Sequence, residues 1–261
     1  MLAARHWQNL GMLALFASMG FGVGPAVRAA HAQAGANDAQ VEADAHKALS
    51  NKKYANVSIS VQGGNAVLRG TVDQYADKVQ AEDRIHRVTG VQAVDDEIRV
   101  AGPTVEDTVL RDKLAKALAS NRVGYGTTAF NAVTLAVKDG IVTLGGTVYG
   151  PPDKDAALGL VATTPGVKGI IDNLKVAPLS PMDDQLRLTL ERAIYGTPQL
   201  QQYALNPDKP IRITVVSGNV TLSGVVDSKA DRDIAGIKAN SVPGVFKVTN
   251  DLEVAGPQPG K

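Results

Sequence analysis

The chain contains no cysteine, which excludes disulfides, zinc–thiolate sites, iron–sulfur clusters and thiol nucleophiles. Aromatic residues make up only 4% of the 261 residues, and the single tryptophan, Trp7, lies close to the N-terminus. An excess of one charge is also missing, because 27 Lys and Arg residues stand against 26 Asp and Glu residues. This balance gives no strongly basic face, so we expect no nucleic-acid partner.

Residues 1–34 have the layout of a secretory signal peptide. Arg5 precedes a soft apolar run over 10–23, and small residues follow with Ala-x-Ala sites that end at Ala32 and Ala34. The apolar run is shorter than the ~20 residues that a membrane span needs. We therefore predict export, with cleavage near Ala32 or Ala34. The alternative is an uncleaved N-terminal anchor.

The rest of the chain contains one unit three times. Each copy has alternating β-branched residues, a glycine-containing turn and a Leu-x-Gly-x-Val ending, at 57–72, 133–148 and 211–226. Further along, each copy has a Gly-Val pair and a last strand-like segment. The spacing predicts three tandem modules, over 38–103, 104–178 and 182–256.

Each copy predicts the same order of elements, which is helix, strand, strand, helix, strand. The apolar spacing indicates first helices near 39–50, 105–119 and 183–195, and second helices near 74–88, 153–162 and 229–241. Between them lies a hairpin with tight-turn residues such as Asp139-Gly140. We predict an α+β fold of three αββαβ modules, each a small three-stranded sheet with two helices packed on one face.

Six glycines recur at equivalent positions and are expected to be structural. They are Gly70, Gly146 and Gly224 in the second strand, and Gly90, Gly166 and Gly244 before the last strand. The first three lie between apolar neighbours on the face predicted to be buried, and a glycine within a strand often marks close approach of another backbone. We expect the second helix to cross the sheet there, at the small residues Ala81, Ala157 and Ala235.

These motifs resemble the BON module, named for bacterial osmotically inducible and nodulation proteins. The resemblance is clearest in the third copy, at 218–226, 242–245 and 248–254, and it extends over nearly all of 38–256. It implies an exported envelope protein of the osmotic-stress periplasmic class, with phospholipid or envelope-surface interaction. It brings no catalytic motif.

Candidate chemistry is sparse. His46 and His86 fall on predicted helices among charged neighbours, with no second histidine at metal-ligand spacing, so we expect them on the surface. The acidic clusters at 95–97 and 183–184 lack the spacing of a calcium loop, and the second cluster is expected to cap a helix. Asp96, Asp172 and Asn250 fall on the apolar phase of their strands, which predicts a bulge or a local backbone hydrogen bond, with a site as the alternative. We expect no enzyme activity, catalytic residue, metal or cofactor.

Two features are candidates for binding. Tyr149 occupies the place of an acid in the other copies and precedes a helix N-terminus, where it and Lys154 are predicted to contact lipid headgroups. The alternative is that Tyr149 packs on its own module. The segment Tyr195–Pro210 is an insertion in the third copy, which either packs within the molecule or offers a partner surface.

The sequence predicts a non-enzymatic periplasmic protein that binds the phospholipid membrane surface in envelope or osmotic-stress protection. Because the net charge is small, such binding needs a local patch, and the middle copy is the only one with more basic than acidic residues. The alternative is a protein-interaction scaffold or a periplasmic holdase that acts on envelope proteins. A hydrolase would need a nucleophile and a base, which the motifs do not supply.

Overall fold

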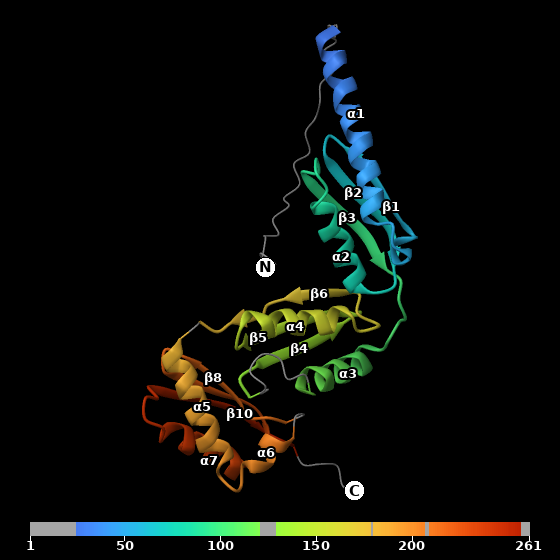
Figure 1. Cartoon of the computed structure of the whole chain (residues 1–261). Helices are drawn as coiled ribbons and strands as arrows, with labels where there is room; N and C mark the ends of the chain where they lie inside the picture. Colours follow the sequence, from blue (N-terminus) through green and yellow to red (C-terminus); the bar gives the residue numbers. More distant parts are fainter. Residues whose placement is uncertain (1–24, 121–128, 179, 207–208, 257–261) are drawn as a thin grey trace, which may run out of the picture.

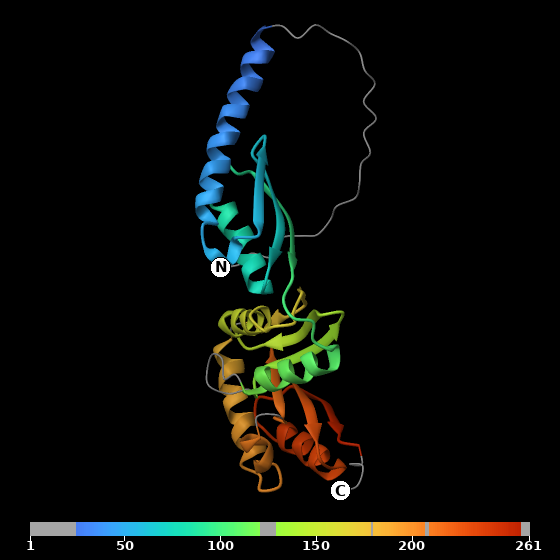
Figure 2. The same cartoon turned by 90° about the vertical axis from the view of Figure 1, so that its right-hand side faces the viewer.

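The computed structural model describes residues 25–120, 129–178, 180–206 and 209–256. Within them the chain forms three αββαβ modules that follow one another along an elongated molecule (Figure 1). Figure 2 shows the same order from the side, with the first helix of module 1 extending beyond its sheet. The predicted α+β fold of three tandem modules is confirmed.

In every module the second strand lies at the centre of the sheet. It pairs antiparallel with the first strand, to which the hairpin turn joins it, and parallel with the last strand. The second helix connects the second strand to the last strand. Module 1 contains α1 (Pro25–Ala48), η1 (Lys52–Tyr54), β1 (Val57–Gln62), β2 (Asn65–Val72), α2 (Tyr75–His86) and β3 (Ala93–Val100).

Modules 2 and 3 repeat this plan with two differences. The last strand of module 2 is interrupted, and module 3 has an additional helix before its first strand. Module 2 contains α3 (Asp107–Ser120), β4 (Ala132–Lys138), β5 (Ile141–Val148), α4 (Pro151–Ala162), β6 (Gly169–Asp172) and β7 (Lys175–Val176). Module 3 contains α5 (Pro181–Tyr195), α6 (Gln201–Leu205), β8 (Arg212–Val216), β9 (Asn219–Val226), α7 (Lys229–Asn240) and β10 (Lys247–Val254).

The expected signal peptide falls mostly outside the described residues, since its apolar run over 10–23 precedes them. The backbone of α1 begins at Pro25 and continues through the predicted cleavage positions at Ala32 and Ala34. None of the described helices is both long and apolar enough to cross a membrane. Export and cleavage stay predictions.

Alternation along the central strand places one face of each sheet against the helices. Ala66, Leu68 and Val72 of β2 are buried, and the equivalent residues of β5 and β9 are buried in the same way. The alanines expected on the second helices, Ala81, Ala157 and Ala235, are buried as well. Burial of these apolar side chains provides the main stabilisation of each small module.

The glycines of the central strands are required for a different reason from the one predicted. Gly70 and Gly224 have φ angles of +124° and +128°, which L side chains rarely adopt. A Cβ on Gly70 would overlap the carbonyl oxygen of Asn56, and one on Gly224 would lie 2.6 Å from that of Pro210. Gly146 is similar, with φ +89°. The close neighbour is therefore the backbone that enters the first strand, and the expectation that the helix requires these glycines is wrong.

Gly90, Gly166 and Gly244 lie in the turn after the second helix, also with positive φ. A Cβ on Gly90 would lie 2.6 Å from Val41 of the first helix, and one on Gly166 would lie 2.8 Å from Val105. Gly90 thus lets the turn approach α1, and Gly166 lets it approach Val105 just before α3. A Cβ on Gly244, in contrast, would make only an ordinary contact with Leu186, at 3.8 Å.

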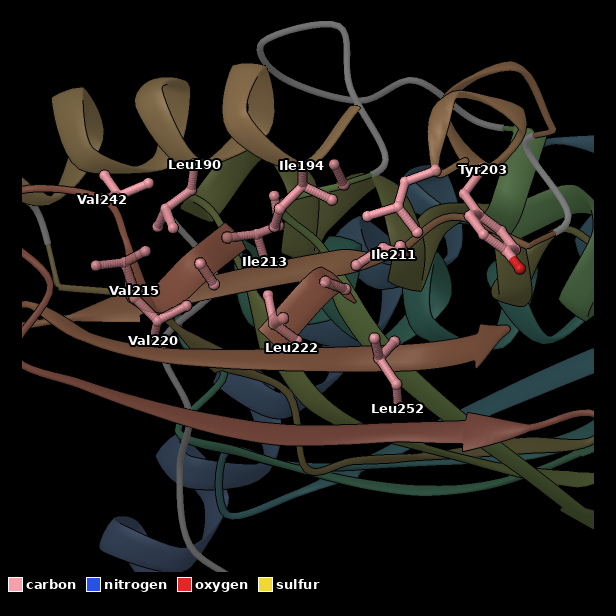
Figure 3. Close-up of a cluster of buried hydrophobic side chains, with 14 of the residues drawn as sticks. Leu190, Ile194, Tyr203, Ile211, Ile213, Val215, Val220, Leu222, Val242 and Leu252 are labelled. Carbon is pink, nitrogen blue, oxygen red and sulfur yellow. The ribbon is translucent and has the colours of Figure 1, made fainter. Parts of the chain in front are cut away.

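The insertion in module 3 packs within the molecule. Leu200 and Tyr203 are buried in the core of module 3, although Leu205 is 78% exposed. Figure 3 shows Tyr203 at one end of this core and Val215, Val220 and Val242 at the other. The interpretation that Tyr195–Pro210 packs internally holds for these described residues.

Candidate functional site

Tyr149, one of the two predicted lipid-binding residues, lies between modules 2 and 3. It directly follows β5, and its backbone N–H donates to the side-chain oxygen of Asn131 over 2.8 Å. Its half-buried ring lies 5.8 Å from the ring of Phe130, and the guanidinium carbon of Arg187 is 5.0 Å from its centre. Tyr149 thus packs against the core of the following module, which neither alternative for this residue had anticipated.

Arg187 is the charged residue at the centre of this interface. It is buried, pairs with Asp184, and donates to the carbonyl oxygen of Val215 over 2.5 Å. A buried cation is costly unless it is paired and hydrogen-bonded. The aromatic face of Tyr149 adds a further favourable contact of the cation–π kind. Arg187 therefore connects α5 both to the edge of its own sheet and to module 2.

Backbone contacts join the same two modules. The N–H of Ile213 in β8 donates to the carbonyl oxygen of Ala129 over 2.5 Å, and the Arg212 side chain donates to the carbonyl oxygen of Asn131 over 3.1 Å. Burial lowers the pKa of Arg212, although nearby Tyr195 raises it. The edges of the two sheets meet here, so this edge of β8 is not free for another strand.

Lys154, the second predicted lipid-binding residue, has partners inside its own module. Its ammonium group lies 2.8 Å from a carboxylate oxygen of Asp172 and 3.0 Å from the carbonyl oxygen of Leu174. The equivalent Lys78 donates to the carbonyl oxygen of Ile98 over 2.6 Å. In both modules this lysine thus attaches the second helix to the last strand. Lipid binding by Tyr149 and Lys154 stays a prediction.

The polar residues on the apolar phase of the last strands make local backbone hydrogen bonds, as predicted. A side-chain oxygen of Asp96 accepts from the N–H of Ile98 over 2.9 Å, and those of Asp172 and Asn250 accept from the residue two positions later over 3.0 and 3.3 Å. Burial raises the pKa of Asp96, although the hydrogen bond from Ile98 and the nearby charge of Lys78 act to lower it. The same bond in each module indicates a structural role.

A second set of carboxylates fixes the hairpin turns. Asp183 accepts from the N–H groups of Ser217 and Gly218 over 2.8 and 2.9 Å, and Asp38 and Asp107 do the same in modules 1 and 2. The sequence interpretation had assigned Asp183 only to helix capping. The signal that was available is an aspartate at the same place in each copy, near the start of the first predicted helix.

Burial acts to raise the pKa of Asp183, but the hydrogen bonds from Gly218 and Ser217, with the nearby charge of Arg187, outweigh it and hold the pKa below 3.8. The carboxylate form is therefore part of the folded structure of module 3.

The two histidines for which exposure was predicted are on the surface, as expected. His46 and His86 are exposed, and His86 lies 3.8 Å from Glu82 on the same helix. Among the described residues no group of three or more His, Asp or Glu side chains is placed to hold a metal ion.

The repeated unit, with its hairpin aspartate, its positive-φ glycines and its polar residue in the last strand, defines a class of small αββαβ modules. The model of the BON domain matches this chain three times, over 37–102, 106–178 and 183–256. The matches cover most of the sequence, and the chain belongs to the BON-domain family.

One curated relative is osmotically-inducible protein Y of Escherichia coli strain K12, which is 26% identical over 173 residues. The match covers 62% of this chain and 79% of the relative. Two solved structures of CdsD, a structural protein of the type III secretion system of Chlamydia trachomatis, are also similar to this chain. The first is 15% identical, with a TM-score of 0.23, and the match covers 84% of this chain and 94% of that one. The second is 16% identical, with a TM-score of 0.21, and the match covers 82% of this chain and 96% of that one. Those TM-scores are too low for any conclusion about this chain.

Proposed function

We propose that this chain is an exported protein of the osmotic-stress class, and that it acts without catalysis by binding the phospholipid surface of the cell envelope. The observation that carries this proposal is the presence of three BON modules over most of the chain. The similarity to osmotically-inducible protein Y supports the osmotic-stress context.

Export is tested by the N-terminal sequence of the protein recovered from the periplasmic fraction. A start near Gln33 or Gly35 is expected, because the Ala-x-Ala sites end just before these positions. A start at Met1 would contradict cleavage. Retention with the membrane pellet would favour the anchor instead.

Membrane binding is tested by flotation of the purified chain with vesicles of zwitterionic or anionic phospholipid, at low and high salt. The near balance of 27 basic and 26 acidic residues means that attraction has to come from a local patch. We expect flotation with anionic vesicles that decreases with salt. Failure to float with any vesicle would contradict this function.

The main alternative is a scaffold or holdase for envelope proteins. The observation that favours it is the contact between modules 2 and 3, where Arg187 meets Tyr149 and the N–H of Ile213 donates to the carbonyl oxygen of Ala129. Salt-insensitive suppression of the aggregation of an unfolded envelope protein, without vesicle binding, would support this alternative.

A further inference from the structure

The three modules allow equivalent surface positions to be compared within one chain. At four positions module 3 has an apolar residue where modules 1 and 2 do not. These are Met182, Val216, Ile237 and Phe246, against Asn37, Gln62, Asp83 and Gln92 in module 1 and Glu106, Lys138, Gly159 and Lys168 in module 2. The shared fold does not require apolar residues there, since two of the three modules fold without them.

These four residues, which we call the tip of module 3, come from four elements that meet at one end of the module. Asp183, next to Met182, binds the N–H groups of the turn that follows Val216. The N–H of Phe246 donates to the carbonyl oxygen of Gly218 in that turn over 2.8 Å. Ile237 lies in the last turn of α7, which leads into the same loop. Figure 3 shows Val215, Val220 and Val242 together at this end of the core, away from Tyr203.

The tip is exposed to solvent. Phe246 is 87% exposed, Met182 is 82% exposed and Ile237 is 67% exposed, whereas the nearby Val242 is buried. Hydrogen bonds fix the backbone beside Phe246 and Met182, so the module holds these side chains outside its core. A cluster of exposed apolar side chains marks an interaction surface.

The charges around the tip favour an anionic partner. Lys247 follows Phe246, Lys238 follows Ile237, and both lysines are exposed. The acids beside Met182 are already engaged, because Asp183 accepts from the hairpin turn and Asp184 pairs with Arg187. An exposed aromatic residue with a lysine next to it suits the interface of an anionic bilayer, where the ring enters the headgroup region and the ammonium group meets phosphate.

We propose that the tip of module 3 inserts Phe246 and Met182 into the interface of an anionic phospholipid bilayer. This proposal rests on the membrane function proposed above and assigns it to residues of module 3, in place of Tyr149 and Lys154. Insertion removes exposed apolar surface from water, and the adjacent lysines orient the module toward the lipid.

The first test uses flotation of the full chain with phosphatidylglycerol-containing vesicles. The double variant Met182→Asn, Phe246→Gln introduces the residues that module 1 has at these positions, so its fold is expected to be retained. We expect its partition coefficient to fall by about tenfold or more, since most of the inserted apolar surface is lost. The matched control is Leu205→Gln, which alters a residue that is 78% exposed outside the tip and is expected to leave partitioning unchanged.

The outcomes separate this proposal from the function on which it rests. If the unaltered chain floats and the double variant floats equally well, the tip assignment is wrong and membrane binding stands. If the unaltered chain floats with no vesicle, the membrane function fails and the tip assignment fails with it.

The second test places a reporter at the tip. Trp7 is the only tryptophan and lies in the segment expected to be removed, so Phe246→Trp gives the exported chain a single tryptophan. We expect its emission to shift to shorter wavelength on vesicle addition and to be quenched by brominated lipid. Gln92→Trp, at the equivalent position of module 1, is the control and should not respond. A Phe246→Trp chain that floats without this shift would overturn the proposal.

Discussion

Modules 1 and 3 contain the same five elements but differ in what lies between the first helix and the first strand. In module 1 this segment is short, and the single turn of η1 buries Tyr54 against the core. In module 3 it is long, and α6 buries Leu200 and Tyr203. The core of module 3 also takes in Ala129 and Phe130 from module 2, whereas the core of module 1 consists of its own residues alone.

The segment between the first helix and the first strand thus packs in its own module in modules 1 and 3, but in a neighbouring module in the case of module 2. The end of the corresponding segment in module 2 packs into module 3, and the edge strands of the two modules meet there. Module 1 contacts module 2 where α2 meets α4, and Tyr75 of α2 packs against the module 2 core. We therefore expect modules 2 and 3 to unfold as one cooperative unit and module 1 to unfold separately.

The largest effect is expected from the central-strand glycines. Gly70→Ala should destabilise module 1 by at least about 3 kcal/mol, because it adds positive-φ strain to a clash with the backbone. Gly224→Ala should cost less, since its Cβ would lie 2.6 Å from the carbonyl oxygen of Pro210 and would not overlap it as at Gly70. Hydrogen exchange in β2 and β9 during urea titration measures both losses.

Gly63→Ala separates strain from clash. Gly63 also has a positive φ, of +59°, but a Cβ there would have no atom within 4 Å. We expect a loss of only about 1 kcal/mol. Equal losses of stability for Gly63→Ala and Gly70→Ala would mean that the clash with the Asn56 carbonyl is not the reason why Gly70 has to be a glycine.

Phe130→Ala tests whether modules 2 and 3 share a core. The ring is 6% exposed and packs among residues of module 3, so its removal should cost about 3 kcal/mol through lost burial and a cavity. Hydrogen exchange should become faster in β8 and β9 and stay unchanged in β1 and β2. Faster exchange in β4 and β5 with protected β8 and β9 would contradict a shared unit.

Asp183→Asn compares the hairpin carboxylates. An asparagine keeps one acceptor and loses the charge, so we expect a loss of about 2 kcal/mol at neutral pH, from charge-assisted hydrogen bonds to Ser217 and Gly218. Asp38→Asn should cost less, because Asp38 is half-buried where Asp183 is buried, and Glu42 stands at the position equivalent to Arg187.

The pH dependence of Asp183→Asn follows from its lowered pKa. The folded-state pKa lies below the unfolded value of 3.8, so the carboxylate contributes stability above 3.8 that is lost as the pH falls through the folded-state pKa. The difference in stability between wild type and Asp183→Asn should therefore narrow below about pH 4. A constant difference in urea midpoint from pH 7 to pH 3 would exclude this origin.

Repetition made the fold predictable, because three copies of one pattern fix the order of elements better than any single copy. For the same reason the sequence predicted the local hydrogen bonds of Asp96, Asp172 and Asn250. A polar residue that recurs among the apolar positions of a strand in every copy needs a partner close by. The contacts between modules could not be predicted in this way. Tyr149 meets Arg187 only after two modules fold and dock, and the positions equivalent to Tyr149 hold aspartates in the other copies, Asp73 and Asp227.

An effect as small as that of Gly63→Ala is expected from the hydroxyl of Tyr203, which lies in α6, the helix that module 3 has and module 1 lacks. It accepts from the N–H of Asp227 over 2.7 Å and donates to Asp231 over 2.8 Å, joining α6 to the start of α7. Tyr203→Phe keeps the buried ring and loses both bonds, which should cost about 1 kcal/mol at pH 7.

Burial and the two nearby carboxylates raise the pKa of Tyr203 to about 12, although the backbone hydrogen bond from Asp227 lowers it. Because the folded-state pKa lies above the unfolded value of 10.0, the hydroxyl contributes stability that is fully present below pH 10 and is lost as the pH rises through about 12. The stability advantage of wild type over Tyr203→Phe should therefore shrink across this range. Tyr54→Phe in module 1 is the comparison, and equal losses in both modules at pH 7 would mean that the additional hydrogen bonds of α6 add nothing to module 3.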